Sequence, residues 1–290
     1  MEYVSHLLVL AAIYTILVVS LDLLIGHTGI MSVAHASLFG LGAYTTALLA
    51  VHYDPPFIIS IVPGMVIGSA MAVIISLASL RLTRDQFVLA TFGFQSILFG
   101  IFENWVSVTR GPFGVSGIPH PRILGLTASS PPLMLILVSA SALLCYAAVI
   151  RFARSPFGRV LRAIREDEVF AKSLGKATYR YKISAFAISG CIAALAGGLY
   201  AYYMTFIDPT SFTIMESILI LSMVIIGGAG SRWGPLVGAL VLVILPEGLR
   251  FLGLPDSVAG SLRQVIYGVL LIAIVIFRPS GLVGSFRLGR

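Results

Sequence analysis

Long apolar runs separated by short polar segments repeat along almost the whole chain. Each run approaches the roughly 20 residues that a helix needs to cross the hydrocarbon core of a bilayer. Hydropathy therefore predicts about nine membrane-spanning helices, with eight to ten as the range. The expected spans are residues 4–21, 30–51, 57–80, 86–107, 132–150, 182–204, 215–230, 234–252 and 262–277. The expected fold is an all-α, polytopic transmembrane helix bundle that forms one domain over residues 1–290.

The second predicted span has an unusual composition. Residues 26–49, GHTGIMSVAHASLFGLGAYTTALL, are rich in Gly, Ser and Ala. Small residues at three- or four-residue spacing let helices pack closely in lipid, and this interpretation explains most of them. The alternative is a broken or re-entrant helix that lines a solute path, since irregular backbone at membrane depth is tolerated where it lines a cavity. The candidate path residues are Ser32, His35, Gly40, Gly42 and Tyr44.

Ionisable residues are scarce within the predicted spans. His35 lies well inside the second span, where a hydrogen bond to a neighbouring helix is favoured over a role as a ligand. Four carboxylates lie close to predicted span ends, where water or headgroups can reach them, and a proton relay is the alternative. These carboxylates are Asp22, Glu103, Glu216 and Glu247.

The composition supports a membrane protein. The chain is 58% hydrophobic and 11% charged, whereas a soluble domain carries about 25% charged residues. A net charge of +7 could indicate a protein that binds nucleic acid. The distribution of the basic residues along the chain indicates instead which loops lie on the inner side of the membrane. If residue 1 lies outside, the inside segments hold fifteen of the 19 Lys and Arg residues, as the positive-inside rule requires. The expected topology is N-out and C-in, with no nucleic-acid partner.

Motifs for covalent chemistry are missing from the sequence. It has no nucleophile elbow and no metal-ligand spacing, and SLGKAT at 173–178 lacks the Ser or Thr that closes a phosphate-binding loop. Cys145 and Cys191 stand in apolar runs and are expected to be packing residues. The first basic residue is Arg81, so a cleavable signal peptide is not expected. We expect no catalytic site, metal or cofactor in this chain.

One densely charged stretch stands out in the longest inside loop, residues 151–182. Residues 158–175 read GRVLRAIREDEVFAKSLG, and the spacing of their apolar positions predicts one amphipathic helix of about four turns. Gly175 is the expected C-terminal cap. A helix lying on anionic lipid, or a solvated loop that only fixes topology, would explain the basic residues. Neither explains the adjacent carboxylates 166–168, which favour docking on a protein partner.

Five motifs, in order, resemble the permease subunits of branched-chain amino acid ABC importers of the LivM type. The first is the Gly-rich stretch at 26–49. The others are GPFGVSGIP (111–119), RAIREDEVFAKSLG with AFAISGCIAALAGGLYAYYMTFIDPTSF (162–212), IIGGAGSRWGPLVGALVLVILPE (225–247) and FRPSGLVG (277–284). Relatives of this type carry further sequence before the first helix, so an N-terminal segment is expected to be missing here.

The resemblance implies a half-transporter in the plasma membrane, the inner membrane of a bacterium or archaeon. Its implied partners are a second, related permease in a heterodimer, two cytoplasmic ABC ATPases that bind ATP and Mg, an extracytoplasmic solute-binding protein and membrane lipid. The usual solutes are Leu, Ile and Val, although related systems carry other amino acids, amides or urea. A stand-alone secondary transporter or channel for a small polar solute is the alternative.

The family's coupling motif matches Glu168, Ala171 and Gly175 of this sequence. The charged stretch matches the cytoplasmic coupling helix that docks on the ATPase, although Glu168 stands seven rather than six residues before Gly175. The expected ATPase-coupling residues are Arg162, Arg165, Glu166, Asp167, Glu168, Ala171 and Gly175. The expected docking residues for the binding protein are Gly111, Gly114, Gly117, Pro119 and Asp208.

Overall fold

The computed structural model describes most of the chain. The described residues are 2–80, 82–123, 126–128, 130–250, 265–266, 268–269, 271–274, 276–278 and 280–284. The longer helices are α1 (Glu2–Thr28), α2 (His35–Tyr53), α3 (Phe57–Ser79), α4 (Arg84–Asn104), α6 (Pro131–Arg154), α9 (Thr178–Met204), α10 (Ile214–Gly227) and α11 (Gly234–Arg250). The shorter ones are α5 (Val106–Thr109), η1 (Gly111–Phe113), α7 (Pro156–Glu166), α8 (Glu168–Ser173) and η2 (Pro209–Phe212).

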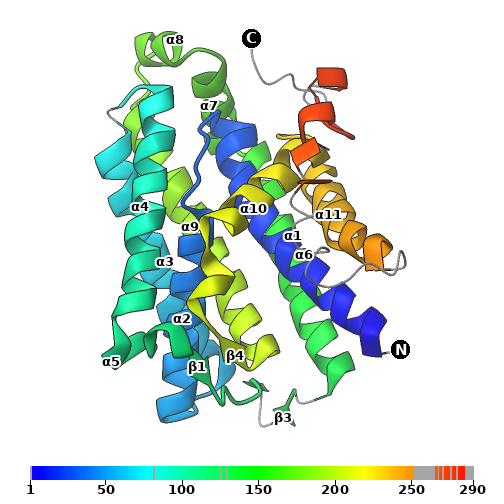
Figure 1. Ribbon diagram of the computed structural model, residues 1–290. Helices are drawn as coiled ribbons and strands as arrows, with labels where there is room; N and C mark the ends of the chain where they lie inside the picture. Colours follow the sequence, from blue (N-terminus) through cyan, green and yellow to red (C-terminus); the bar gives the residue numbers. More distant parts are fainter. Residues whose placement is uncertain are drawn as a thin grey trace.

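Four two-residue strands complete the described structure. They are β1 (Val115–Ser116), β2 (Arg122–Ile123), β3 (Leu126–Thr127) and β4 (Phe206–Ile207). Both pairs, β1 with β4 and β2 with β3, are antiparallel. The strands lie at one end of the bundle, and α8 lies at the other (Figure 1). We call these the β1 end and the α8 end.

The helices form a membrane-type bundle. Within the described ranges, five helices are long and apolar enough to cross a membrane, namely α1, α3, α4, α6 and α9, while α10 and α11 are shorter apolar helices. Eight predicted spans each coincide with a described helix, α2 included. The ninth, 262–277, lies partly outside the described residues, and its described residues are helical. Of the basic residues in the topology prediction, Arg81, Arg263, Arg287 and Arg290 also lie outside them.

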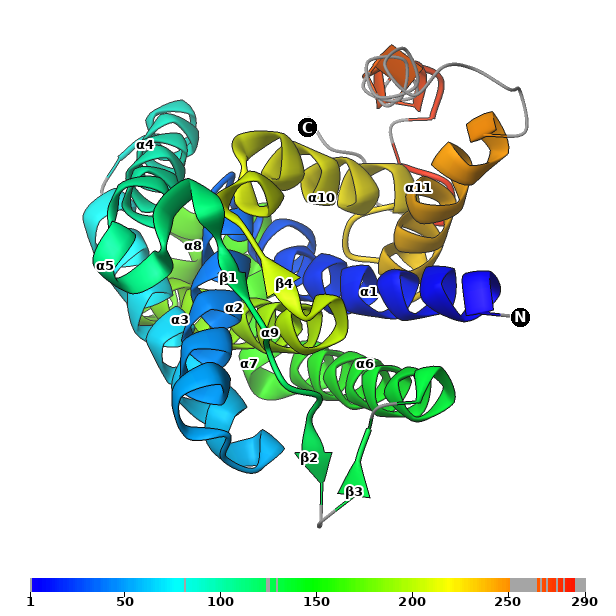
Figure 2. The same cartoon turned by 60° about the horizontal axis from the view of Figure 1, so that its bottom comes forward.

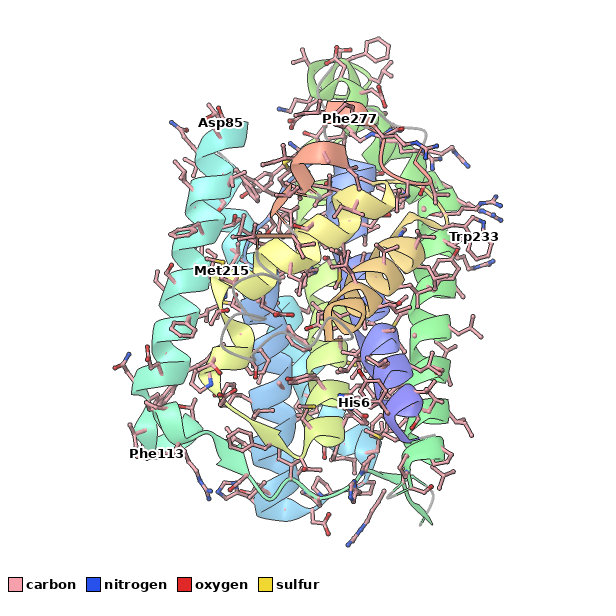
Figure 3. All side chains as sticks on the ribbon, turned by 45° about the vertical axis from the view of Figure 1, so that its right-hand side comes forward. His6, Asp85, Phe113, Met215, Trp233 and Phe277 are labelled. Atoms are coloured by element: carbon pink, nitrogen blue, oxygen red, sulfur yellow. The ribbon has the colours of Figure 1, made fainter. Side chains whose placement is uncertain are left out.

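α1 and α9 lie in the middle of the bundle. α9 packs against α2 and α3, while α1 packs against α6, α10 and α11 (Figure 2). Side chains project outward from the peripheral helices as well as inward (Figure 3). Many of the exposed ones are large and apolar, for example Ile58 on α3, Leu89 on α4 and Leu144 on α6. An apolar exterior over several helices is the surface that a bilayer covers.

Glycines set the distance between α2 and α9. A Cβ atom at Gly42 would lie 2.0 Å from the carbonyl oxygen of Ala194, and one at Gly197 would lie 1.9 Å from that of Phe39. A Cβ at Gly190, farther along α9, would lie 2.4 Å from the Cβ of Ala72 on α3. These backbones therefore touch directly, which is the close approach that small residues allow in lipid.

The first two predicted spans differ from the helices observed. α1 continues to Thr28, so Asp22 lies within a helix with 3% of its surface exposed. The expectation that Asp22 reaches water at a span end was therefore wrong; its Oδ1 instead accepts a hydrogen bond from the Gly230 backbone N–H at 2.7 Å. Residues 29–34 are non-helical and run from the α8 end into the bundle, where α2 begins at His35 (Figure 1). The second predicted span therefore begins as non-helical chain and continues as one unbroken helix, and a re-entrant solute path here stays a prediction.

Candidate coupling and transport sites

The charged stretch between α6 and α9 forms two helices. α7 ends at Glu166, Asp167 is extended (φ −152°, ψ 107°), and α8 begins at Glu168. The Asp167 Oδ1 atom accepts a hydrogen bond from the Phe170 N–H at 2.9 Å. The prediction of one four-turn helix was wrong because Asp caps a helix N-terminus better than it extends a helix. Gly175, at φ +76° just after α8, confirms the predicted C-terminal cap.

Arg165 joins α7 to the end of α1. Its Nη1 donates to the carbonyl oxygen of Gly26, and its Nη2 contacts Glu166 Oε1 at 2.9 Å. The side chain is 12% exposed, and its Cγ would lie 2.9 Å from a Cβ built on Gly29. The guanidinium therefore fills the space where α1 ends. Arg165 therefore links this segment directly to the central helix α1.

Glu168 holds α8 against the start of α9. Its Oε2 lies 2.5 Å from Lys182 Nζ, and its Oε1 accepts from Thr178 Oγ1 at 3.1 Å and pairs with Lys172 Nζ at 3.2 Å. Partial burial alone would raise the pKa of Glu168, but the contacts with Lys182, Lys172 and Thr178 outweigh it and hold the pKa below its usual range. Glu168 thus ties α8 to α9 within the chain, and its contact with a partner stays a prediction.

Replacing Glu168 with Gln should therefore lower thermal stability in a pH-dependent way. A carboxyl whose folded pKa is depressed stabilises the fold above its unfolded pKa, about 4.3, and loses this contribution as the pH falls through the folded value. The melting temperature of E168Q in detergent should lie below that of the wild type from pH 8 to 5, and the two should converge under more acidic conditions. E103Q, at an exposed position on α4, is the matched control. Equal melting of E168Q and wild type at pH 7 would contradict this role.

The tip of α8 carries an exposed apolar patch. Val169, Phe170 and Leu174 are 76%, 60% and 61% exposed on a short helix at the end of the bundle (Figure 1). We call these three residues the α8 patch. Exposed apolar groups of this kind mark a site of interaction with a protein or a membrane. Buried Ala171, which is 1% exposed, packs on the inner side of the same helix.

A cluster of buried polar side chains surrounds the break before α2. The first amides of α2 have no partner within the helix, so Ala36 N–H donates to Ser217 Oγ at 2.9 Å and Ser37 N–H to Gln95 Oε1 at 2.8 Å. Gln95 Nε2 donates to the carbonyl oxygen of Phe212 at 2.8 Å. Gln95 on α4 therefore connects the start of α2 with the segment before α10.

Two further polar contacts extend this cluster. His35 Nε2 lies 2.7 Å from Ser20 Oγ on α1, and the Ser189 hydroxyl on α9 donates to the Ser20 carbonyl at 2.6 Å. The hydrogen bond of His35 to a neighbouring helix is confirmed. On the other side, the Val33 N–H donates to Thr91 Oγ1 at 3.2 Å. Together these contacts join α1, α2, α4, α9 and α10 around the break.

Replacing Gln95 with Leu should destabilise the protein by about 1–3 kcal/mol, since it leaves the buried Ser37 N–H and Phe212 carbonyl without partners. The melting temperature of the purified protein measures this loss. S96A is the control, because Ser96 is exposed on the same helix and bonds only to its own turn. Unchanged stability of Q95L would show that the break does not depend on this side chain.

The structure places all five predicted path residues in the interior at or beyond the break. Gly42 packs on α9, and a Cβ at Gly40 would lie 2.7 Å from the Phe102 ring. The Tyr44 ring stacks on Phe102 with centroids 4.9 Å apart, and Ser32 is 1% exposed. Solute passage along these residues stays a prediction.

Both predicted outer segments meet at the β1 end. Val115 pairs with Ile207 and Ser116 with Phe206, so residues 111–119 lie beside 206–208. The positive φ angles of Gly111, Gly114 and Gly117 shape this loop, and Pro119 is half-buried. Asp208 accepts hydrogen bonds from the hydroxyls of Thr210 and Ser211. The docking of a binding protein here stays a prediction.

Comparison with known proteins identifies the family of this chain. Residues 3–275 match the family model of the branched-chain amino acid transport system permease component. The chain belongs to this family. It is therefore a membrane-embedded component of a transport system, and the helix bundle described above is its permease fold.

Individual relatives agree with this family. The permease is similar to the high-affinity branched-chain amino acid transport system permease protein LivM of Escherichia coli K12, with 31% identity over 96% of this chain and 69% of the relative. It is similar to a probable LivM of Methanocaldococcus jannaschii, with 29% identity over 78% and 68%. It is also similar to LivH of Escherichia coli K12, with 26% identity over 95% and 92%. No solved structure matches the chain significantly.

Sequence reasoning missed several residues of this permease. The α8 patch went unnoticed because an amphipathic pattern does not say which apolar positions remain exposed. Gln95, Thr91 and Ser217 were also missed, although polar residues within predicted spans are a usable signal in the sequence. Within the described residues, no group of three or more His, Cys, Asp or Glu side chains could hold a metal ion.

Proposed function

We propose that this permease imports branched-chain or related amino acids by alternating access, driven by ATP that separate subunits bind and hydrolyse. It would form one transmembrane domain, residues 1–290, in the plasma membrane of a bacterium or archaeon. The proposed topology is N-out and C-in with about nine spans, and its coupling loop covers about 151–182. The partners would be a related second permease, two ABC ATPases and an extracytoplasmic binding protein. This chain would hold no cofactor and no ATPase site of its own.

The observation that carries the proposal is the α7–α8 pair in a family of transport permeases. An exposed apolar patch projects beyond the bundle at the α8 end, where most of the described basic residues lie. Such a patch suits docking in a protein groove. In a family of transport-system permeases, an ATPase is the partner that would supply the energy for solute import.

Two side chains would transmit the motion of α7 and α8. Arg165 bonds to the end of α1, and Glu168 bonds to Lys182 near the start of α9. α1 and α9 are the two central helices, so a displaced coupling segment would move both relative to α2 and its break. Close packing makes such helices switch between discrete arrangements instead of bending gradually.

The solute would pass near the break before α2. Two polar atoms of predicted path residues, His35 Nδ1 and the Tyr44 hydroxyl, are buried without hydrogen-bond partners among the described residues. Buried polar groups are normally satisfied, so these atoms could bind a polar solute in another conformation. Few charges line this region, and specificity would then reside mainly in the binding protein.

Reconstitution tests the proposal. The permease, co-expressed with the second permease, ATPases and binding protein encoded in the same genome, should take up radiolabelled leucine, isoleucine or valine into liposomes only with ATP and Mg²⁺. Omission of any one subunit should abolish uptake. Uptake by this chain alone without ATP would instead show a stand-alone carrier and overturn the proposal.

A further inference from the structure

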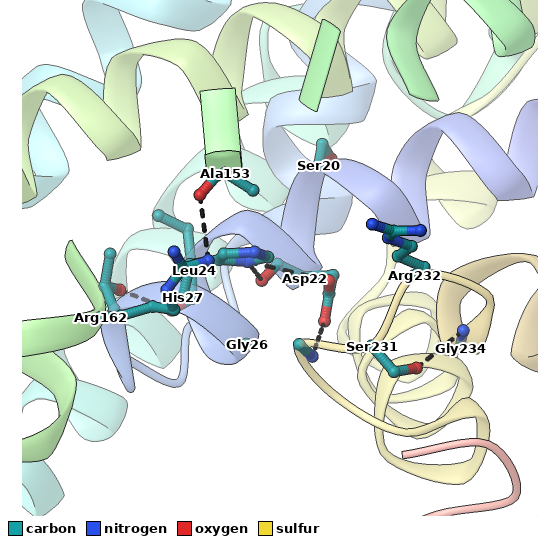
Figure 4. A network of polar contacts seen from close by, with 12 residues as sticks. Ser20, Asp22, Leu24, Gly26, His27, Ala153, Arg162, Ser231, Arg232 and Gly234 are labelled. Atoms are coloured by element: carbon teal, nitrogen blue, oxygen red, sulfur yellow. Dashed lines mark hydrogen bonds and ion pairs between the residues drawn. The ribbon is translucent and has the colours of Figure 1, made fainter. Parts of the chain in front are cut away.

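A second region of the permease, away from the α8 patch, combines a basic cavity with an apolar groove. The cavity lies between α1, α6, α7 and residues 230–235, and has a volume of about 250 Å³. Figure 4 shows part of its lining, with Arg162 beside α1 and Arg232 near the start of α11. Arg154, from the last turn of α6, also lines it.

Positive charge dominates this cavity. Three guanidinium groups line it, and Asp22 is its one carboxylate among the described residues. That carboxylate accepts the hydrogen bond of the Gly230 N–H. Arg162 donates to the carbonyl oxygen of Ala153 at 3.0 Å, but none of the ion pairs between described residues includes any of the three arginines. The cavity is therefore built to attract an anion from outside the chain.

The groove continues from the cavity along the outer face of the bundle. It has a volume of about 380 Å³ and runs between α1, α6 and α11, lined by Leu8, Ala12, Leu143, Leu236 and Leu240 among others. Tyr146 lines both the cavity and the groove. A ligand that filled both would need an anionic end and an apolar end.

Aromatic side chains mark the junction of the two parts. The Tyr146 hydroxyl donates to the carbonyl oxygen of Arg232 at 2.8 Å, and its ring lies 6.2 Å from the ring of Trp233. Trp233 is 57% exposed on the outer face (Figure 3). Tyr and Trp concentrate at the depth where headgroups meet hydrocarbon. The junction therefore coincides with the change from headgroup to acyl chain.

We propose that this region binds one anionic phospholipid, with its phosphate among Arg154, Arg162 and Arg232 and an acyl chain in the groove. Charge complementarity selects an anionic lipid over a zwitterionic one, because a neutral headgroup gains little from three guanidinium groups. The bound lipid would fill the space between α1, α6 and α11 and hold the α10–α11 loop against α1. This inference does not depend on the transported solute.

Quenching of Trp233 fluorescence tests the proposal. The chain has 2 Trp residues, so the full-length W105F variant reports on Trp233 alone. Reconstituted in phosphatidylcholine, W105F should be quenched more strongly by phosphatidylglycerol with brominated acyl chains than by phosphatidylcholine with the same chains. R154Q/R232Q, which alters two exposed side chains, should lose about thirtyfold in this preference, since each basic residue near an anionic lipid contributes about 1 kcal/mol and two are removed.

The controls separate this site from non-specific effects. R159Q/R180Q removes the same charge from exposed positions at the same end and should keep the preference, as should addition of inorganic phosphate. Equal quenching by both lipids, an unchanged preference in R154Q/R232Q, or its loss on adding phosphate would each overturn the proposal. So would loss of the preference when the second permease is bound, because the groove would then be a subunit interface.

Discussion

Uptake by the reconstituted transporter should fall at least about tenfold when Arg165 is replaced by Met, while ATP hydrolysis continues. The Met side chain fills a similar volume but cannot donate to the Gly26 carbonyl, which removes the link from α7 to α1. Hydrogen bonds from charged groups stabilise a structure by about 1.5–3 kcal/mol, which corresponds to roughly ten- to a hundredfold in an equilibrium. The ratio of leucine transported to ATP hydrolysed measures the effect.

The control for this prediction is R159M, because Arg159 is exposed on the same helix and its replacement should leave the ratio unchanged. Normal coupling in R165M would show that motion reaches α1 by another route. Loss of the assembled complex, seen by size-exclusion chromatography, would show that Arg165 matters for folding instead of coupling.

The second large effect concerns packing at Gly197. Replacing Gly197 with Val should destabilise the permease by about 3 kcal/mol, the upper part of the range for overpacked cores. A Cβ there would lie 1.9 Å from the carbonyl oxygen of Phe39, and backbone atoms cannot rotate away as a side chain does. The helices α2 and α9 would have to separate. The expected readout is a strongly lowered melting temperature or loss of the monodisperse protein in detergent.

G100V is the matched control, because a Cβ at Gly100 on α4 would meet no atom within 4 Å. It introduces the same side chain into a helix and should leave the melting temperature within a few degrees of the wild type. A G197V protein as stable as G100V would mean that α2 and α9 do not touch through their backbones.

The helical membrane fold could be predicted from the sequence because the length of the apolar runs alone largely specifies it. Helix ends could not, since they depend on partners in the folded bundle. Asp22 illustrates this: a carboxylate ordinarily marks a span end, but here the Gly230 N–H lets it be buried within α1. The start of α2 could not be predicted from the sequence. The first amides of α2 are satisfied by Gln95 and Ser217, and these two residues lie far from α2 along the chain.

The coupling segment shows the same limit on a smaller scale. Its charge, its location in a basic loop and its closing Gly175 were all readable from the sequence. The break at Asp167 and the inward direction of Glu168 were not, because a periodic pattern does not reveal that Lys182 and Thr178 compete for this carboxylate. Asp167 and Glu168 fix α8 within the chain, Glu166 is exposed, and apolar side chains of α8 also face outward. The docking of these carboxylates on a partner stays a prediction.

Photo-crosslinking at the two ends of the bundle tests the central claim most directly. Phe170 on the α8 patch and Phe113 at the β1 end (Figure 3) are 60% and 83% exposed, so each can be replaced by benzoylphenylalanine with little effect on folding. In the complete complex, position 170 should cross-link to an ATPase subunit, and position 113 should cross-link to the binding protein and never to an ATPase. An ATPase cross-link from position 113, or none from position 170 in an active complex, would contradict ATP-driven coupling through α7 and α8.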